Sequence, residues 1–289
     1  MPGFDYTYDA SGRRTAISTL NGAWQYGYDV NGQLTSVTLP AGGSVQYSYD
    51  AAGNRTAMVS GGGSIGYNVN NLNQYTSAGG SAYGYDADGN LTSQQSGGAW
   101  GYAYDDEDRL IAVTGPSQSW SYQYDSLGNR VAQTSGSSTT QFLVNPLGLS
   151  SVVAEFDGGG KLVSHFAYGL DLTTSLPASG SAAFYQFDGS KNTATVTGAG
   201  GAVLNAYSYM PFGEKLQSTG TFANSFTFSG QFGVQDDSNG LYYMRARYYD
   251  TSVGRFISED PLMLVRPFNL FGSGEAVAGA AHLNRSNFL

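Results

Sequence analysis

The chain has 289 residues, which is long enough to bury a sizeable hydrophobic core. Its aromatic content of 14% argues against disorder, because disordered chains are poor in aromatic residues. The absence of cysteine excludes disulfide bonds, thiolate catalysis and cysteine-based zinc sites. The net charge of −9, with no basic cluster before Arg245, argues against nucleic acid as a partner.

The sequence has no run of 18 or more apolar residues, so it predicts no transmembrane segment. Its first residues lack the basic and apolar regions of a signal peptide, and they lead directly into a repeated unit. A chain that starts within a repeat is expected to be part of something longer or a short relative of it.

The repeated unit is a tyrosine followed by an aspartate, with a glycine three residues after the aspartate. The second position of the unit falls at residues 9, 29, 50, 68, 86, 105 and 125, which is a period near 20; the copies at Asn68 and Asp105 are decayed. A fixed period of this length indicates one supersecondary unit copied many times. Five copies keep both residues: Asp9 and Gly12, Asp29 and Gly32, Asp50 and Gly53, Asp86 and Gly89, and Asp125 and Gly128.

Each copy is predicted to form a β-hairpin. Before the turn, large residues alternate with small or polar ones, as in residues 120–124, which is the period of a strand with one aromatic face. Aspartate suits the first position of a type I turn, and glycine suits the fourth. This local geometry explains the aspartates without catalysis, so the sequence predicts no metal site and no cofactor. The loop at Asp86 lacks the further ligands of an EF-hand.

Beyond the regular hairpins the spacing loosens, but we find no linker that would separate domains. The sequence predicts one continuous all-β architecture built of repeated hairpins. We divide it into regular hairpins over residues 1–135, degenerate hairpins over 136–206, a distinct segment over 207–261 and a short divergent tail over 262–289.

The segment 207–261 is dense in aromatic residues, and it contains three arginines within eleven residues. Arginines among tyrosines stack on rings and pair with carboxylates while largely buried. Repeat arrays also need atypical ends, so we expect this segment to be a packed plug that ends the sheet. Its characteristic residues are Arg245, Arg247, Tyr248, Tyr249, Asp250, Gly254 and Arg255.

The tyrosine–aspartate units resemble the YD repeats of Rhs proteins, teneurins and the C components of Tc toxin complexes. The segments 240–250 and 255–261 resemble the Rhs repeat-associated core domain. The resemblance covers about residues 4–261 and implies a long sheet of hairpins that spirals into a partial or complete hollow shell, closed by the core plug. It also implies a secreted or cell-surface location and, in bacterial members, enclosure of a C-terminal toxin during export.

The resemblance further implies an aspartic protease in the core region, which cuts the shell free of its toxin. Such chemistry needs two close carboxylates that share a proton, and Asp260 matches the first of them. The sequence departs from the family here, because it has no aspartate after Asp260 and only Glu275. We therefore expect a structural shell without a toxin domain, in which self-cleavage is absent or crippled unless Asp260 meets a carboxylate from earlier in the chain.

Two further possibilities remain open from the sequence. A sheet rich in tyrosine and tryptophan could bind carbohydrate or another protein through Trp24, Trp100 or Trp120. An open sheet also leaves unpaired edges, which invite strand addition. We therefore expect further repeat shell, or copies of the chain itself, as partners, besides a toxin cargo or a surface glycan or protein.

Overall fold

The computed structural model describes residues 3–19, 22–148 and 150–261, and it shows the all-β architecture that the sequence predicts. The tail over residues 262–289 lies outside the described residues. Strands β1 to β22 form a 22-stranded antiparallel sheet, in which each strand pairs with the next along the chain. We call this sheet the wall.

The wall is a meander of short strands. Its first half comprises β1 (Asp5–Tyr8), β2 (Arg14–Thr19), β3 (Gly22–Tyr28), β4 (Leu34–Thr38), β5 (Ser44–Tyr49), β6 (Arg55–Ser60), β7 (Gly63–Val69), β8 (Tyr75–Ala78), β9 (Ser81–Tyr85), β10 (Leu91–Gln95) and β11 (Ala99–Tyr104). Its second half comprises β12 (Leu110–Thr114), β13 (Ser119–Tyr124), β14 (Arg130–Ser135), β15 (Ser138–Asn145), β16 (Ser151–Asp157), β17 (Leu162–Tyr168), β18 (Leu172–Pro177), β19 (Ala183–Phe187), β20 (Thr193–Gly198), β21 (Val203–Tyr209) and β22 (Lys215–Gly220).

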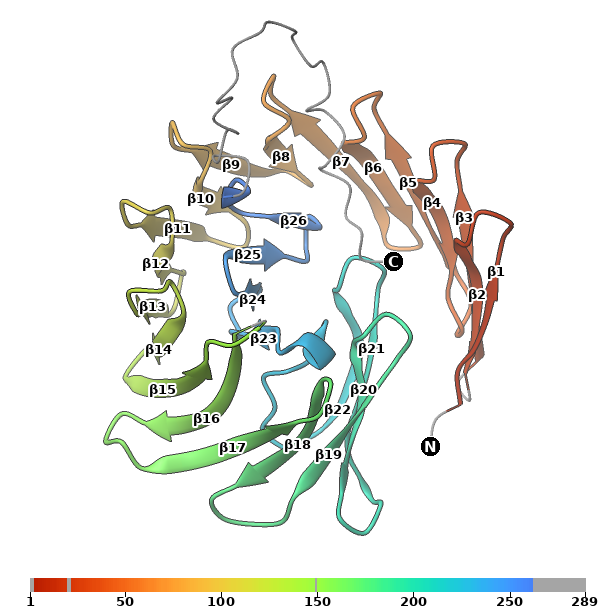
Figure 1. Ribbon diagram of the computed structural model, residues 1–289. Coiled ribbons are helices and arrows are strands. Elements are labelled where there is room, and N and C mark those ends of the chain that lie inside the picture. Colours follow the sequence, from red (N-terminus) through yellow and green to blue (C-terminus); the bar gives the residue numbers. More distant parts are fainter. Residues whose placement is uncertain (1–2, 20–21, 149, 262–289) are drawn as a thin grey trace, which may run out of the picture.

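The rest of the described chain lies inside the wall. In Figure 1 the strands β1 to β22 run around a ring, and the last strands lie within it. This inner part comprises the short 3₁₀ helix η1 (Gly230–Phe232) and a four-stranded sheet of β23 (Gln235–Asp236), β24 (Leu241–Met244), β25 (Arg247–Asp250) and β26 (Arg255–Phe256). We call residues 221–261 the plug. The segment 207–261, predicted from sequence as the plug, thus begins within wall strand β21 and includes β22.

The hairpins share one irregularity that bends the wall. In β3–β4, Gly27 pairs with Ser36 but Tyr28 pairs with Leu34, so one extra residue enters the second strand directly after the turn. The same shift occurs beside the turns at residues 50–53 and 125–128. Such β-bulges bend a strand and increase its twist, so their repetition curves the sheet in one direction.

The turns of the regular hairpins lie side by side and contact one another. The Asn54 side chain donates to the Asn73 side chain of the next turn at 2.9 Å, and Asn90 donates to Asp108 at 2.7 Å. Arg13 donates to the carbonyl of Asp29 at 3.1 Å. The turns therefore form one continuous edge of the wall, which we call the turn rim; it is made of residues 9–12, 29–32, 50–53, 70–73, 86–89, 105–108 and 125–128.

The wall returns to its own start. The amide of Gly189, in the turn between β19 and β20, donates to the Tyr6 hydroxyl at 2.5 Å. Arg14 donates to the Ser190 hydroxyl at 2.5 Å, and its guanidinium lies 4.9 Å from the centre of the Tyr6 ring. These contacts join residues more than 170 positions apart, and we call them the seam. Within the described residues, β1 pairs only with β2, and β22 pairs only with β21.

Candidate functional site

The repeat aspartates lie in the turns and bind the turn backbone. In each of the five complete copies, Oδ1 of the aspartate accepts the amides of the residues two and four positions later, at 2.8–3.1 Å. The five turn glycines have φ between 76° and 86°, a region that favours glycine. The Arg13 amide helps to hold the pKa of Asp9 below its ordinary value. These carboxylates therefore serve to hold the turn backbone through hydrogen bonds.

The three tryptophans are placed on the packed side of the wall. Trp24 and Trp120 are each 7% exposed, and both belong to core clusters. Trp100 is partly buried and stacks on Trp120 with ring centres 6.0 Å apart. A ligand platform needs an open ring face, and Trp24 and Trp120 do not offer one.

The plug packs against the inner face of the wall as a continuous apolar core. Leu241, Tyr243, Tyr248 and Ile257 of the plug share one cluster with buried side chains of β10 to β13. These wall side chains are Leu91, Tyr102, Leu110, Val113, Trp120 and Tyr122. The interior of this part of the ring is thus filled by protein.

The three arginines of the plug contact aromatic rings or polar acceptors. Arg247 covers the Phe256 ring, with its guanidinium carbon 3.7 Å from the ring centre. Arg255 lies 4.0 Å from the centre of the Tyr75 ring and donates to the Asn54 side chain at 2.5 Å. Arg245 donates to backbone carbonyls, including that of Phe232. Two of the three arginines thus cover aromatic rings.

The remaining predicted plug residues form its buried centre. Tyr248 and Tyr249 are 3% and 7% exposed, and Tyr249 donates to the carbonyl of Phe212 at 3.1 Å. Asp250 accepts the Ser252 hydroxyl at 2.6 Å and the Ser252 amide at 2.8 Å, while burial raises the pKa of its carboxyl. Gly254 has φ of 69°, and a β-carbon there would lie 3.2 Å from the Phe212 ring.

Asp260 lies at the end of the plug beside a cation. Its Oδ2 is 3.0 Å from Nη2 of Arg247, and its side chain is 36% exposed. The preceding Glu259 packs on the backbone of Gly89, at the turn rim. Within the described residues, Asp260 thus forms an ion pair with an arginine. Shared-proton chemistry requires instead a close pair of carboxylates.

A buried ion pair between wall and plug involves a residue that the sequence analysis did not single out. Arg130 of β14 is 2% exposed, and its Nη1 lies 2.6 Å from Oδ2 of Asp237 in the plug. The same guanidinium donates to Gln235 at 2.8 Å and lies 4.0 Å from the centre of the Tyr243 ring. Burial alone would lower the pKa of Arg130, but the charge of Asp237 raises it well above its ordinary value.

Arg55, on another hairpin, also joins the wall to the plug. It is 6% exposed, donates to the carbonyl of Val253 at 2.7 Å and lies 4.4 Å from the centre of the Tyr67 ring. A sequence signal for these residues exists: the second residue after the turn glycine faces inward, and it is a buried leucine in other copies, such as Leu34 and Leu91. An arginine at this position indicates a partner inside the ring.

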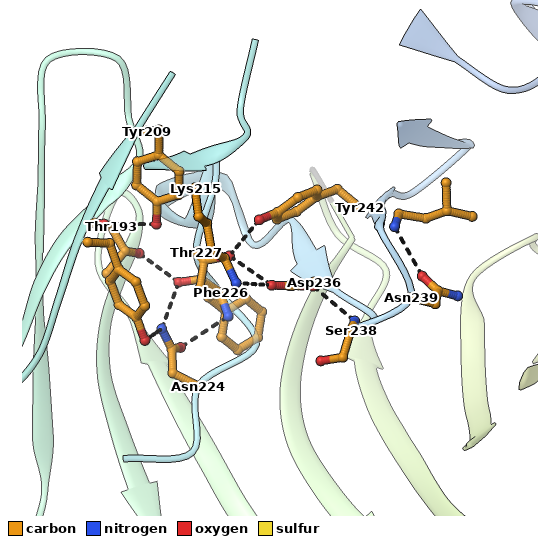
Figure 2. A network of polar contacts seen from close by, with 12 residues as sticks. Thr193, Tyr209, Lys215, Asn224, Phe226, Thr227, Asp236, Ser238, Asn239 and Tyr242 are labelled. Carbon is orange, nitrogen blue, oxygen red and sulfur yellow. Dashed lines mark hydrogen bonds and ion pairs between the residues drawn. The ribbon is translucent and has the colours of Figure 1, made fainter. Parts of the chain in front are cut away.

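A polar network anchors the plug where the chain leaves the wall (Figure 2). Lys215 of β22 pairs with Asp236 of β23, and the Thr227 hydroxyl donates to the Tyr242 hydroxyl at 3.2 Å. Thr193 of β20 donates to the carbonyl of Phe226 at 2.7 Å. The start of the plug is thus joined to the last wall strands by an ion pair and hydrogen bonds.

One partly buried carboxyl of the wall, that of Glu155, has a raised pKa. Glu155 of β16 lies between two largely buried neighbours in the register, Phe142 of β15 and Ser164 of β17. Burial raises the pKa of Glu155 to about 7, and the charge of Arg130 only partly offsets this.

Neither a metal site nor a membrane-spanning helix is seen in the part of the chain that the structure describes. No three histidine, cysteine, aspartate or glutamate side chains gather in a way that would hold a metal ion within residues 3–19, 22–148 and 150–261. Over the same residues, no helix has the length and hydropathy needed to span a membrane.

The chain is similar to several known proteins over parts of their length. It is 32% identical over 167 residues to the tRNA3(Ser)-specific nuclease WapA of Bacillus spizizenii, which covers 55% of this chain and 7% of that protein. It is 39% identical over 82 residues to the double-stranded DNA deaminase toxin A of Burkholderia cenocepacia, covering 26% of this chain and 6% of that protein.

The chain is also 37% identical over 65 residues to a salivary gland surface protein of Aedes aegypti. This match covers 22% of this chain and 2% of that protein. The chain therefore spans less than a tenth of the length of these relatives. Among solved structures, a TcdB2–TccC3 crystal structure aligns with 89% of this chain and 18% of that chain, at 15% identity and a TM-score of 0.44.

The model of the teneurin YD-shell family matches residues 3–269, which is nearly the whole chain. This match agrees with the tyrosine–aspartate period, the hairpin wall and the inner plug. The chain belongs to the teneurin YD-shell family.

Proposed function

We propose that this chain is the plugged end of a YD-repeat shell and that its role is structural. The observation that carries the proposal is the apolar cluster shared by the plug and β10 to β13, which fills the interior beside these strands. An interior packed in this way has no room for a folded cargo. The space for a cargo would have to be enclosed by further hairpins.

The free edges of the sheet support the addition of further hairpins. Within the described residues β1 has one free side and β22 has another, and a free strand edge is a template for a further strand. We propose that additional YD hairpins join the wall at β1, and that a toxin domain is the cargo of the combined shell, which is exported. The nuclease and deaminase named for the relatives belong to those much longer proteins, of which this chain matches less than a tenth.

The proposal is tested by extending the wall. A second copy of residues 44–135 is fused before the first hairpin, and the control fusion carries the same residues in scrambled order. We expect cryo-electron microscopy to show the added hairpins continuing the sheet from β1 around an empty space. Added hairpins that form a separate particle, or that a protease removes as readily as the scrambled control, would contradict the proposal.

A structural role also predicts that the chain does not cut itself. Arg247 pairs with Asp260, and an ion pair of this kind stabilises the charged carboxylate rather than a shared proton. Wild type and Asp260→Asn should therefore give the same intact mass after long incubation at acidic and neutral pH. Cleavage near Pro261 in wild type that is lost in Asp260→Asn would show a protease instead.

A further inference from the structure

The last residues of the plug travel along the turn rim in one direction. Arg255 contacts the turns at residues 50–53 and 70–73, through Asn54 and the carbonyl of Asn73. The carbonyl of Ile257 accepts the amide of Leu91 at 2.8 Å, and Glu259 packs on Gly89, next to the turn at residues 86–89. From Arg255 to Glu259 the chain thus passes from the turns at residues 50–53 and 70–73 to the turn at residues 86–89.

The path then meets a cavity of about 210 Å³. Pro261 lines this cavity, together with residues of the turns at 105–108 and 125–128 and of the β24–β25 turn. Its apolar lining includes Leu110, Tyr124, Leu127 and Ile257. The cavity therefore lies where the described part of the chain ends.

The charged side chains at the cavity are already engaged. Arg109 pairs with Asp105 at 2.7 Å and with Glu107 at 2.8 Å, and Arg247 pairs with Asp260 at 3.0 Å. Arg245 donates to backbone carbonyls. The cavity is thus better suited to an apolar chain segment than to a free anion.

Leu127 marks the apolar side of this cavity. It stands at the third position of its turn and is 74% exposed, although a leucine gains free energy from leaving water. Residues 262–265, which follow Pro261 directly and lie outside the described residues, are Leu, Met, Leu and Val. Three residues of extended chain reach about 10 Å, so this segment is long enough to cross the cavity.

We propose that the cavity between the turns at 105–108 and 125–128 is a docking site for residues 262–265 of the same chain, with Leu127 as its apolar contact. The chain thereby continues along the turn rim in the direction already taken by Arg255, Ile257 and Glu259. This inference goes beyond the proposed function and does not depend on it, because it concerns contacts within one chain.

The chain has no cysteine, so a pair of introduced cysteines tests the proposal directly. The double variant L127C/L264C is compared with L72C/L264C. Leu72 is a matched control because it also occupies the third position of a rim turn and is 72% exposed. It belongs to the turn at residues 70–73, which Arg255 contacts, and it does not line the cavity at Pro261. A disulfide requires the two Cα atoms to come within about 7 Å.

We expect L127C/L264C to form the intramolecular disulfide faster than L72C/L264C by roughly tenfold or more, since effective concentration follows proximity. Loss of two hydrogens in the intact mass and non-reducing peptide mapping measure the reaction. Equal rates, faster reaction of L72C/L264C, or no disulfide in either variant would overturn the proposal.

A second measurement avoids cysteine altogether. Thermolysin cleaves before apolar residues, and docking shields residues 262–265 from it. Leu127→Asp should therefore speed cleavage in this segment several-fold, whereas Leu72→Asp should leave the rate as in wild type. Both substitutions lie on exposed turn tips, so the fold is retained, and circular dichroism verifies this. Equal cleavage rates in the two variants would contradict the docking site.

Discussion

At the scale of single residues, Arg130 joins the two layers of the molecule. Its guanidinium is enclosed by plug and wall, and it combines an ion pair, hydrogen bonds and a ring contact. A buried ion pair is weak evidence for net stability, since desolvation offsets much of the attraction. Loss of one partner is costly, however, because the other charge stays buried. Arg130 therefore fixes which plug residues face β14.

We predict that Arg130→Met lowers the free energy of unfolding by about 3–5 kcal/mol, because Asp237 is then buried without a partner. The matched control is Arg13→Met, which breaks a half-exposed pair with Asp9 and should change stability little. Urea unfolding followed by tryptophan fluorescence measures both variants. Equal losses in the two variants would show that burial of the pair does not matter.

Glu155 predicts a pH dependence of stability. Its pKa of about 7 lies above the value of 4.5 expected when it is exposed, so the folded state binds the proton more tightly than the unfolded state. Its contribution to stability is complete below about pH 4.5 and is lost as the pH rises through 7. The loss is at most about 3 kcal/mol, and the nearby charge that opposes it is Arg130.

Glu155→Gln should therefore remove a fall in stability that wild type shows between pH 5 and pH 8. The control is Glu214→Gln, at an exposed position of the turn before β22, which should keep that fall. Thermal unfolding at several pH values gives the comparison. An identical pH profile in wild type and Glu155→Gln would contradict the assignment.

At the scale of elements, hairpin turns share the same backbone hydrogen bonds, but their surroundings differ. Gly128 has φ of 81° and open space around it, whereas Gly213 has φ of 95° and the Phe228 ring 2.8 Å from where a β-carbon would lie. Both glycines close a turn in which their amide donates to the carbonyl three residues earlier. At Gly128 the backbone conformation alone favours glycine. At Gly213 the packing of the Phe228 ring also leaves no room for a side chain.

Gly128→Ala should cost about 1–2 kcal/mol, which is the usual penalty for a side chain in the left-handed region. Gly213→Ala should cost clearly more, because the Phe228 ring must also move. Urea unfolding of the pair tests this order. A cost for Gly213→Ala no greater than that for Gly128→Ala would mean that the plug yields easily at Phe228.

Much of the wall could be predicted from the sequence, because its rules are local. The aspartate and glycine of a turn lie three residues apart, and the alternation of Trp120 and Tyr122 is visible within one strand. The contacts of the plug could not be predicted in this way. Arg130 meets Asp237 across 107 positions, and Arg55 meets Val253 across 198, so no short pattern pairs them. The sequence indicated that the plug arginines would contact rings and polar groups, but it did not indicate which wall residues they would contact.

At the scale of the whole molecule, the seam decides how tightly the ring is held at its start. It rests on few contacts, among them those of Tyr6 and Arg14 with the turn at residues 188–191. The first hairpin has no neighbour on its other side within the described residues, so its order depends on β3 and on this turn. Local opening should therefore begin there.

Gly189→Ala tests the seam, since a β-carbon at this position would lie 2.6 Å from the Tyr6 ring. We expect faster hydrogen exchange in β1 and β2, with exchange in β12 and β13 unchanged. The control is Gly200→Ala, where a β-carbon would meet no atom within 4 Å. Unchanged exchange in β1 would show that the first hairpin does not rely on the seam.

The turn rim also limits how such a wall can change in length. Three pairs of neighbouring rim turns are joined by hydrogen bonds, and consecutive turns on this edge are separated by two strands. Loss or gain of a single strand would send every later turn to the opposite edge and leave its side chains without their neighbours. Insertions and deletions in such walls should therefore come in whole pairs of strands, so that its evolution proceeds in steps of one repeat.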